Sequence, residues 1–345
     1  MNFAWCLRCL ALLGLTLFAA ASGADPSGQQ RAEAAGRSLL GAPAPRLTLK
    51  TIDGETIDLA SIYGKKAVYI KFWATWCTPC REQMPHFERT YESAGPDLAV
   101  IAIDVGFNDS IEQVRRYQRE LGITMPMVFD GDGQAAAAFH LRVTPQHIVI
   151  GRDGRVRYVG HLADQRLDEA LAAARAPGVA VGPAAAGRVR GPIGEQHFGV
   201  GDQLPEGSAR ILNGQAFEFQ KPDSHRPTVI VFLSPWCETY LATTRPQVSA
   251  NCRTVREQVN TLAPDRPVRW LGIASGLWAA PSDLRAYRAE YKVVIPLTLD
   301  ESGAWFRAFQ VTNVPTVIVA DAHGKIVQRI EPDDAQSLPK ALDHL

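Results

Sequence analysis

Two cysteines separated by two residues, Cys77 and Cys80, form the pair in this sequence best suited to chemistry. An apolar, β-favouring run at 67–73 precedes them, and the pattern of 80–91 predicts a helix. A helix start offers unpaired backbone N–H groups and the positive end of the helix dipole, which lower the pKa of a thiol placed there. The pattern therefore predicts thiol–disulfide exchange, with Cys77 as the attacking thiolate and Cys80 as the thiol that resolves the mixed disulfide.

Two other interpretations of the pair are weaker. Half of a zinc site is the first, but structural zinc takes four ligands and no second Cys/His pair stands at finger spacing. An inert structural disulfide is the second, but such bridges usually tie distant segments and not the two ends of one helical turn. The strand-to-helix context favours redox chemistry.

Length and charge set the broad class of protein. A chain of 345 residues predicts two domains better than one. The 36 lysines and arginines equal the 36 aspartates and glutamates, so nothing points to nucleic acid or an anionic membrane surface as a partner. A hydrophobic fraction of 46% is typical of a soluble globular protein.

The N-terminus is predicted to be a signal peptide over 1–24. Arg8 supplies the positive charge, 10–21 the apolar run, and 22–24 a small-residue cleavage site. The apolar run is short for a membrane span, although an uncleaved anchor is the alternative. Exported proteins can hold disulfides, so the remaining cysteines are free to pair and the predicted location is the periplasm.

The first half of the chain predicts an α/β sheet with mixed strand directions. Residues 25–40 are predicted to be a tether, and 41–175 the first domain. The predicted strands are 47–50, 55–59, 67–73, 98–104, 127–129, 146–150 and 156–159. The predicted helices are 80–91 (with a kink at Pro85), 110–121, 135–139 and 162–174.

The second half repeats the first. Trp76–Cys77 recurs 160 residues later as Trp236–Cys237, and Pro145 recurs 170 residues later as Pro315. One insertion of about ten residues after the second Trp-Cys explains both offsets, and repeats of this size indicate two similar domains. An Ala/Gly/Pro-rich linker is predicted over 176–197 and the second domain over 198–345.

The stretch 72–80 (Phe-Trp-Ala-Thr-Trp-Cys-Thr-Pro-Cys), Pro85 and Val143–Thr144–Pro145 resemble the thioredoxin superfamily, in particular its exported TlpA/ResA branch. The resemblance implies two tandem thioredoxin-like domains. It implies that Pro145 is cis and that Thr144 pairs with an extended substrate like an added strand. It also implies that Trp76 flanks the reactive sulfur and that no cofactor is needed.

The sequence departs from this family at two positions. Lys71 occupies the place of a buried carboxylate in thioredoxin. It either points to solvent from a sheet edge, the more ordinary arrangement, or lies beneath Cys77 and lowers its pKa. The branch often has Glu three residues after the second cysteine, where this chain has Gln83 beside Glu82. Either Glu82 handles protons, or it only complements the helix dipole and solvent does so.

The second half lacks the dithiol. Tyr240 stands where the resolving cysteine belongs, so only Cys252 can pair with Cys237. On one unbroken helix 15 residues would separate them by about 22 Å, too far for a disulfide, but a break at Pro246 could fold the chain back. Pro315 keeps the cis-proline pattern. The second half is therefore predicted to be a binding or scaffold module, with or without a Cys237–Cys252 bridge.

The resemblance implies a periplasmic reductase of protein disulfides, working in cytochrome c assembly or metal-site maturation and re-reduced by a membrane-bound donor. A disulfide oxidase or isomerase would carry the same motif, because direction depends on redox potential. A different class is a metallochaperone in which Cys77 and Cys80 hold Cu(I), although few methionines or histidines lie nearby.

Overall fold

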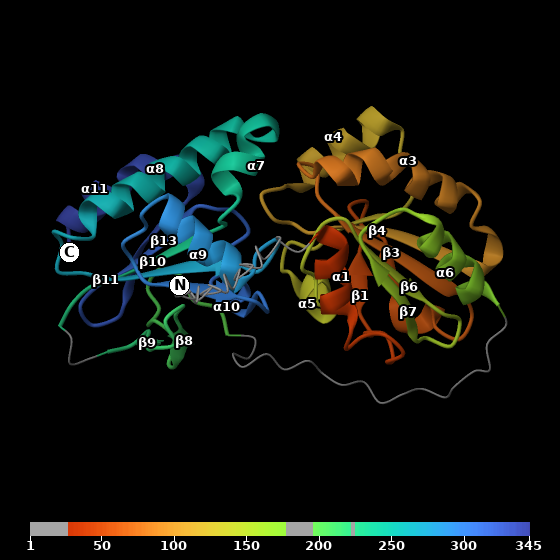
Figure 1. Cartoon of the computed structure of the whole chain (residues 1–345), viewed down its shortest axis with the longest axis horizontal. Coiled ribbons are helices and arrows are strands. Elements are labelled where there is room, and N and C mark those ends of the chain that lie inside the picture. The colour runs from red at the N-terminus through yellow and green to blue at the C-terminus, as the bar shows by residue number, and fades with distance from the viewer. Residues whose placement is uncertain (1–26, 177–195, 222–224) are drawn as a thin grey trace, which may run out of the picture.

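The computed structural model describes residues 27–176, 196–221 and 225–345. The predicted signal peptide and residues 177–195 of the predicted linker lie outside these ranges. Two α/β domains stand side by side, each built on a mixed five-stranded sheet flanked by helices (Figure 1). The predicted fold of two tandem thioredoxin-like domains is confirmed. Within the described residues, no helix has both the length and the apolar character that crossing a bilayer requires.

The sheet of the first domain has the strand order β5-β4-β3-β6-β7. Its strands are β3 (Ala67–Trp73), β4 (Leu98–Asp104), β5 (Met127–Phe129), β6 (Gln146–Ile150) and β7 (Val156–Gly160). Strands β3, β4 and β5 are parallel, whereas β6 and β7 run antiparallel to their neighbours. A small hairpin, β1 (Thr48–Lys50) and β2 (Thr56–Asp58), precedes this sheet. Strand β3 is central and buried throughout, so it delivers the cysteine turn from the middle of the domain.

Helices cover both faces of this sheet. They are α2 (Leu59–Ile62), α3 (Thr78–Glu92), α4 (Ile111–Leu121), α5 (Gln134–Ala138) and α6 (Gln165–Arg175), with a 3₁₀ turn η1 at Gly95–Asp97. Helix α3 starts directly after Cys77, with Pro79 in its first turn, where a missing N–H costs nothing. It continues through Pro85 to Glu92, so Pro85 does not end the helix.

Helix α1 (Gly28–Gly36) lies in the stretch predicted to be a tether. A capping box starts it: Ser27 Oγ accepts from the N–H of Gln30, and the Gln30 side chain accepts from the N–H of Ser27. Gly36 packs against Val159 on β7, where a Cβ would lie within 2.5 Å of that side chain. The Ala/Gly composition that suggested a tether is instead what permits close packing on the sheet.

The second domain repeats this plan with the order β12-β11-β10-β13-β14. Its strands are β8 (Ser208–Arg210), β9 (Ala216–Glu218), β10 (Thr228–Leu233), β11 (Arg269–Ser275), β12 (Leu297–Asp300), β13 (Thr316–Ala320) and β14 (Ile326–Ile330). Its helices are α7 (Cys237–Thr244), α8 (Pro246–Leu262), α9 (Pro281–Glu290), α10 (Ala304–Ala308) and α11 (Leu338–Asp343), with a 3₁₀ segment η3 at Pro332–Ser337. The helical structure is interrupted between α7 and α8, at Arg245 and Pro246. This interruption lies close to the segment that the sequence predicted to be inserted.

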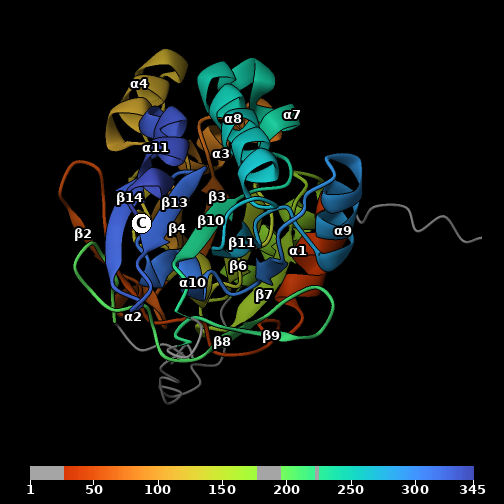
Figure 2. The ribbon, with the colours of Figure 1, turned by 90° about the vertical axis from the view of Figure 1, so that its left-hand side faces the viewer.

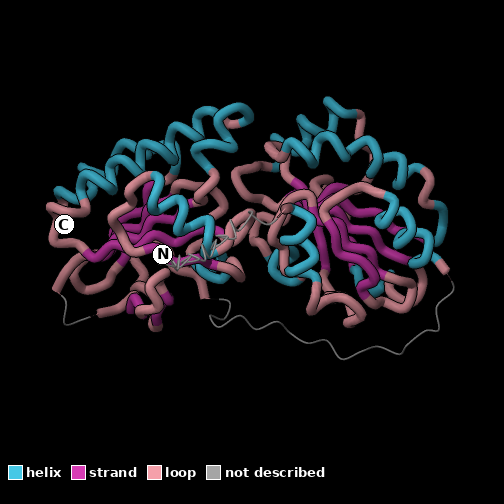
Figure 3. The backbone as a smooth tube through the Cα atoms, viewed as in Figure 1, coloured by secondary structure: helices cyan, strands magenta, loops and turns pink. Residues whose placement is uncertain are grey.

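The helices α3 and α8 lie on the same side of the two sheets (Figures 1 and 3). Viewed end-on, the two sheets stand one behind the other with these helices above them (Figure 2). As a result, the turn that carries Cys77 and the turn that carries Cys237 both lie at the junction between the domains, where Trp76 contacts Trp236.

Candidate active site

Cys77 and Cys80 are joined by a disulfide at the start of α3. Cys77 caps the helix, because its sulfur accepts a hydrogen bond from the backbone N–H of Cys80 at 3.2 Å. This is the placement that favours a thiolate once the bridge is reduced. Both residues are buried, Cys77 with 1% of its surface exposed and Cys80 with none.

The turn before the disulfide is fixed by two contacts with the loop after β4. Trp76 is buried and its Nε1–H donates to the carbonyl of Phe107 at 2.6 Å. Thr75 donates to Asp109 from its backbone N–H, at 2.7 Å, and from its hydroxyl. The turn therefore depends on Asp109, a residue that sequence reasoning missed because its contact with Thr75 spans 34 positions.

The peptide bond between Thr144 and Pro145 is cis, and so is that between Val314 and Pro315. Pro145 offers its carbonyl to His161 Nδ1 at 2.7 Å. A carbonyl only accepts, so Nδ1 of His161 carries the proton. Thr144 is buried, and its hydroxyl accepts from Trp278 Nε1 of the second domain at 3.3 Å.

Lys71 is fully buried in the middle of β3, so the more ordinary prediction, a solvent-facing lysine on a sheet edge, is wrong. Its Nζ donates to the carbonyl of Cys80 at 3.3 Å and lies 5.3 Å from the centre of the Phe87 ring. Burial lowers the pKa of Lys71 from 10.5 to about 7. β3 is a central strand, so its side chains have no open edge from which to reach water.

A buried polar network continues from β3 to the proline loop. His147 on β6 lies opposite Lys71 and contacts Tyr69 Oη at 2.9 Å and Gln83 Oε1 at 2.8 Å. Gln83 then donates to the carbonyl of His161 at 3.3 Å. Burial, followed by the charge of Lys71, lowers the pKa of His147, so this ring is neutral. Gln83, which replaces the Glu common in the TlpA/ResA branch, thus ties α3 to the loop of Pro145.

Two buried carboxylates stand behind the cysteine turn. Asp104 ends β4 with no exposed surface, and its Oδ1 accepts from the N–H of Gly106 at 2.9 Å. Burial and the neighbouring charge of Asp109 raise the pKa of Asp104. By contrast, Glu82 is exposed on α3. Lys71, Asp104 and Asp109 are thus buried ionisable groups behind the turn, and the sequence singled out only Lys71.

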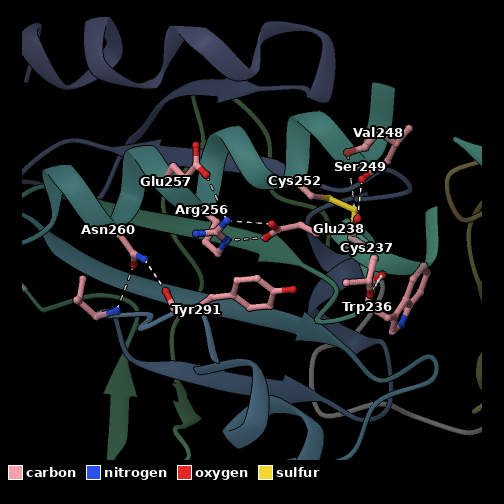
Figure 4. A network of polar contacts seen from close by, with 12 residues as sticks. Trp236, Cys237, Glu238, Val248, Ser249, Cys252, Arg256, Glu257, Asn260 and Tyr291 are labelled. Atoms are coloured by element: carbon pink, nitrogen blue, oxygen red, sulfur yellow. Dashed lines mark hydrogen bonds and ion pairs between the residues drawn. A yellow bond between two sulfur atoms is a disulfide. The ribbon is translucent and has the colours of Figure 1, made fainter. Parts of the chain in front are cut away.

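In the second domain, Cys237 and Cys252 form a disulfide with their Cα atoms 6.3 Å apart. The break before Pro246 folds α8 back along α7 and makes this possible. Next to the bridge, Arg256 holds the Glu238 carboxylate through Nε at 2.7 Å and Nη2 at 3.0 Å, and Ser249 donates to the carbonyl of Glu238 (Figure 4). The bridge joins two helices that other contacts already hold together.

No group of three or more His, Cys, Asp or Glu side chains that could hold a metal ion occurs among the described residues.

Comparison with known proteins agrees with this geometry. Residues 40–159 match the AhpC/TSA family and residues 199–345 match Redoxin. The thioredoxin-like protein YneN of Bacillus subtilis is 32% identical over 134 residues, which are 38% of this chain and 78% of YneN. The thiol-disulfide oxidoreductase ResA of Halalkalibacterium halodurans is 32% identical over 132 residues, 37% of this chain and 73% of that protein. The chain belongs to the thioredoxin-like thiol-disulfide oxidoreductases.

Membership of this family assigns oxidoreductase activity on disulfides to the chain. ResA of Bacillus subtilis is 30% identical over 117 residues, 34% of this chain and 64% of ResA. A crystal structure of a thioredoxin-like protein from Aeropyrum pernix is 25% identical, with 37% of this chain and 89% of that chain covered and a TM-score of 0.33.

Proposed function

We propose that this oxidoreductase reduces disulfides of protein substrates through Cys77 and Cys80. The observation that carries the proposal is the Cys77–Cys80 disulfide at the first turn of α3, with Cys77 as the helix cap. A bond in this position is readily opened, because the helix start stabilises the Cys77 thiolate that opening produces.

In the first step, the Cys77 thiolate attacks one sulfur of a substrate disulfide. A Cys77–substrate disulfide forms, the substrate bond breaks, and the leaving sulfur departs as a thiolate that takes a proton from water. Thr144 and Pro145 hold the substrate backbone, and Trp76 flanks the reacting sulfur. Backbone pairing of this kind accepts many sequences, as a reductase of proteins requires.

In the second step, Cys80 loses its proton and attacks Cys77. The Cys77–Cys80 disulfide forms and the second substrate thiolate leaves, so that the substrate gains two electrons and the enzyme loses two. We assign the acceptance of the Cys80 proton to Lys71, which lies beside the Cys80 carbonyl and whose pKa of about 7 leaves part of its amine neutral. The exposed Glu82 is the other candidate for this role.

We further propose that the chain works in the periplasm after export by residues 1–24, and that a membrane-bound thiol donor returns it to the dithiol form. Substrates in cytochrome c assembly or metal-site maturation fit a reductase of cysteine pairs. The second domain, which has no dithiol, is proposed to bind a partner. Residues 41–175 and 198–345 are the proposed domains, joined by a linker at 176–197.

A trapping experiment tests the proposal. A Cys80→Ser variant should accumulate mixed disulfides through Cys77 that mass spectrometry identifies, whereas a Cys77→Ser variant should trap none. Equilibration with glutathione gives the direction, since a potential near that of the most oxidising catalysts would instead indicate an oxidase or isomerase. Stoichiometric uptake of Cu(I) by the reduced protein, without trapping, would indicate the metallochaperone.

A further inference from the structure

The second domain covers the disulfide of the first. The rings of Trp76 and Trp236 lie 5.2 Å apart, and Tyr240 packs edge-on against Trp76. Tyr240 Oη also accepts the backbone N–H of Thr78, at 3.2 Å. This N–H is one of the unpaired groups at the start of α3, immediately after Cys77. Tyr240 thus occupies the backbone N–H of the residue that directly follows Cys77.

The two proline loops are engaged in the same way. Asn108 donates its N–H to the carbonyl of Thr312, and Trp278 donates its N–H to the carbonyl of Arg142, both at 2.8 Å. These two bonds are related by the repeat, because 278 and 312 follow 108 and 142 by 170 residues. In addition, Val314, which precedes the second cis proline, donates its N–H to Asn108 Oδ1 at 2.9 Å. Each domain therefore contacts the loop of the other that would present a substrate groove.

An ion pair joins the second domain to the cysteine turn itself. Arg245, at the break between α7 and α8, donates to the hydroxyl of Thr75 and lies 3.3 Å from Asp109 Oδ1. The Asp109 side chain is fully buried and that of Arg245 is 23% exposed. Removing Arg245 would leave a buried charge unpaired and so weaken the closed arrangement, which the ion pair Arg31–Asp283 between α1 and α9 also supports.

The interface is nevertheless incompletely filled. A solvent-open cleft of about 850 Å³ lies between the domains, lined by residues of both, including Phe107, Arg142, Leu277 and Phe306. Around this cleft one apolar cluster continues from Phe107 to Phe306, so separating the domains has to expose apolar surface as well as break the polar contacts.

We propose that the second domain is a reversible cover of the Cys77–Cys80 site, and that protein substrates enter only when the two faces separate. The covering residues are Trp236, Tyr240, Arg245 and Trp278. This inference rests on the proposed function, since it concerns access to the same disulfide. In the closed form Trp278 and Tyr240 hydrogen-bond to Thr144 and Thr78, and Cys77 keeps only 1% of its surface exposed, so a protein chain cannot reach its sulfur.

Full-length Arg245→Gln is the test, with Arg253→Gln, an exposed arginine on α8, as the matched control. Amide hydrogen exchange is followed at Thr78, Asn108 and Trp278, whose N–H groups bond across the interface. In Arg245→Gln we expect these three amides to exchange about tenfold faster than in the wild type, and insulin to be reduced about tenfold faster. Both changes correspond to weakening the closed form by about 1.4 kcal/mol. The control should match the wild type in both measurements.

A second variant, Tyr240→Ala, keeps the test possible if Arg245→Gln does not fold. It should also speed up amide exchange and insulin reduction. The proposal is overturned if these three amides exchange as slowly as those of the sheets in all variants, or if faster exchange leaves insulin reduction unchanged. Because exchange needs no turnover, loss of reductase activity in every variant would count against the proposed function, and the exchange result would still decide whether the cover opens.

Discussion

The two domains share a backbone plan but differ in the residues behind the cysteine turn. Lys71 in β3 corresponds to Val231 in β10 (offset 160), and the buried carboxylate Asp104 corresponds to Ala274 (offset 170). His147, which lies opposite Lys71, corresponds to Val317, which lies opposite Val231. The second domain has thus replaced the buried ionisable groups with small or apolar ones. It keeps the fold without counterparts of Lys71, Asp104 and His147.

The cysteine pairs of the two domains also differ. Cys80 lies one helical turn after Cys77, whereas Cys252 lies on a second helix and its bridge is next to the Glu238–Arg256 ion pair. Cys77 and Cys237 both lie at a helix start, but Cys77 caps its helix and pairs within the first turn, whereas the Cys237–Cys252 bridge fastens two helices. The role of each disulfide therefore follows from the residues that surround it.

The largest expected effect is the difference in insulin reduction between variants of the two disulfides. Cys77→Ser should lower insulin reduction by roughly three orders of magnitude, to the background of the added dithiol, because it removes the nucleophile. Cys237→Ser should leave the rate within about twofold of the wild type. Turbidity of insulin chains measures both variants. An equal loss in Cys237→Ser would mean that both bridges take part in turnover.

The buried lysine should make stability depend on pH in the first domain. Between pH 7 and 10.5 the unfolded chain holds a proton on Lys71 that the folded chain has lost, so stability rises with pH by roughly 1.4 kcal/mol per unit. Lys71→Met, which conserves volume, removes this term. Its advantage over the wild type should be largest below pH 7 and shrink towards pH 10.5.

Urea unfolding of both proteins at a series of pH values measures this difference, from which contributions common to both proteins cancel. A constant difference across that range would show that Lys71 titrates normally. If Lys71 accepts the Cys80 proton, the variant should also release trapped substrate more slowly near pH 7, and higher pH should restore the rate by ionising Cys80 directly.

The second bridge should matter for stability. Cys237→Ala combined with Cys252→Ala should destabilise the second domain by about 3 kcal/mol, the value for closing a loop of this length. Unfolding followed by tryptophan fluorescence under oxidising conditions measures the change. Adding a strong reductant to the wild type should erase the difference. No loss of stability under oxidising conditions would contradict a structural role.

The smallest effect is expected at Glu82. Glu82→Gln should change the rate of insulin reduction by less than about twofold, because an exposed carboxylate is readily replaced by water. Comparison with Lys71→Met in the same assay decides between the two proton-handling candidates. A loss in Glu82→Gln larger than that in Lys71→Met would assign the role to Glu82.

Local patterns were sufficient to predict much of the fold. Strands 67–73, 98–104 and 146–150 have the predicted bounds, because continuous apolar runs between turn residues leave few alternatives. The unequal offsets of 160 and 170 indicated an insertion after the second Trp-Cys. In the structure, two helices, α7 and α8, separated at Pro246, stand where the first domain has the single helix α3. This break also explains how Cys237 reaches Cys252.

The sequence could not predict features that depend on distant partners. The apolar run at 67–73 is typical of a strand buried on both faces, but lysines are usually exposed, so the residue type at position 71 favoured a solvent-facing side chain. Asp109 and His161 owe their roles to contacts with Thr75 and Pro145, which no spacing rule reveals. Nothing in the local sequence marks Trp278, which hydrogen-bonds Arg142 and Thr144 across the domain junction. Such contacts exist only once both domains are in place.

The repeat-related bonds of Asn108 and Trp278 have a consequence for how this junction can change. They are isologous, as in a two-fold symmetric homodimer, yet the halves are encoded separately. In a homodimer every substitution alters both sides at once. Here the two positions already differ, since one is Asn108 and the other Trp278. Substitutions on one side of the junction can therefore change how strongly the domains associate without altering the cysteines.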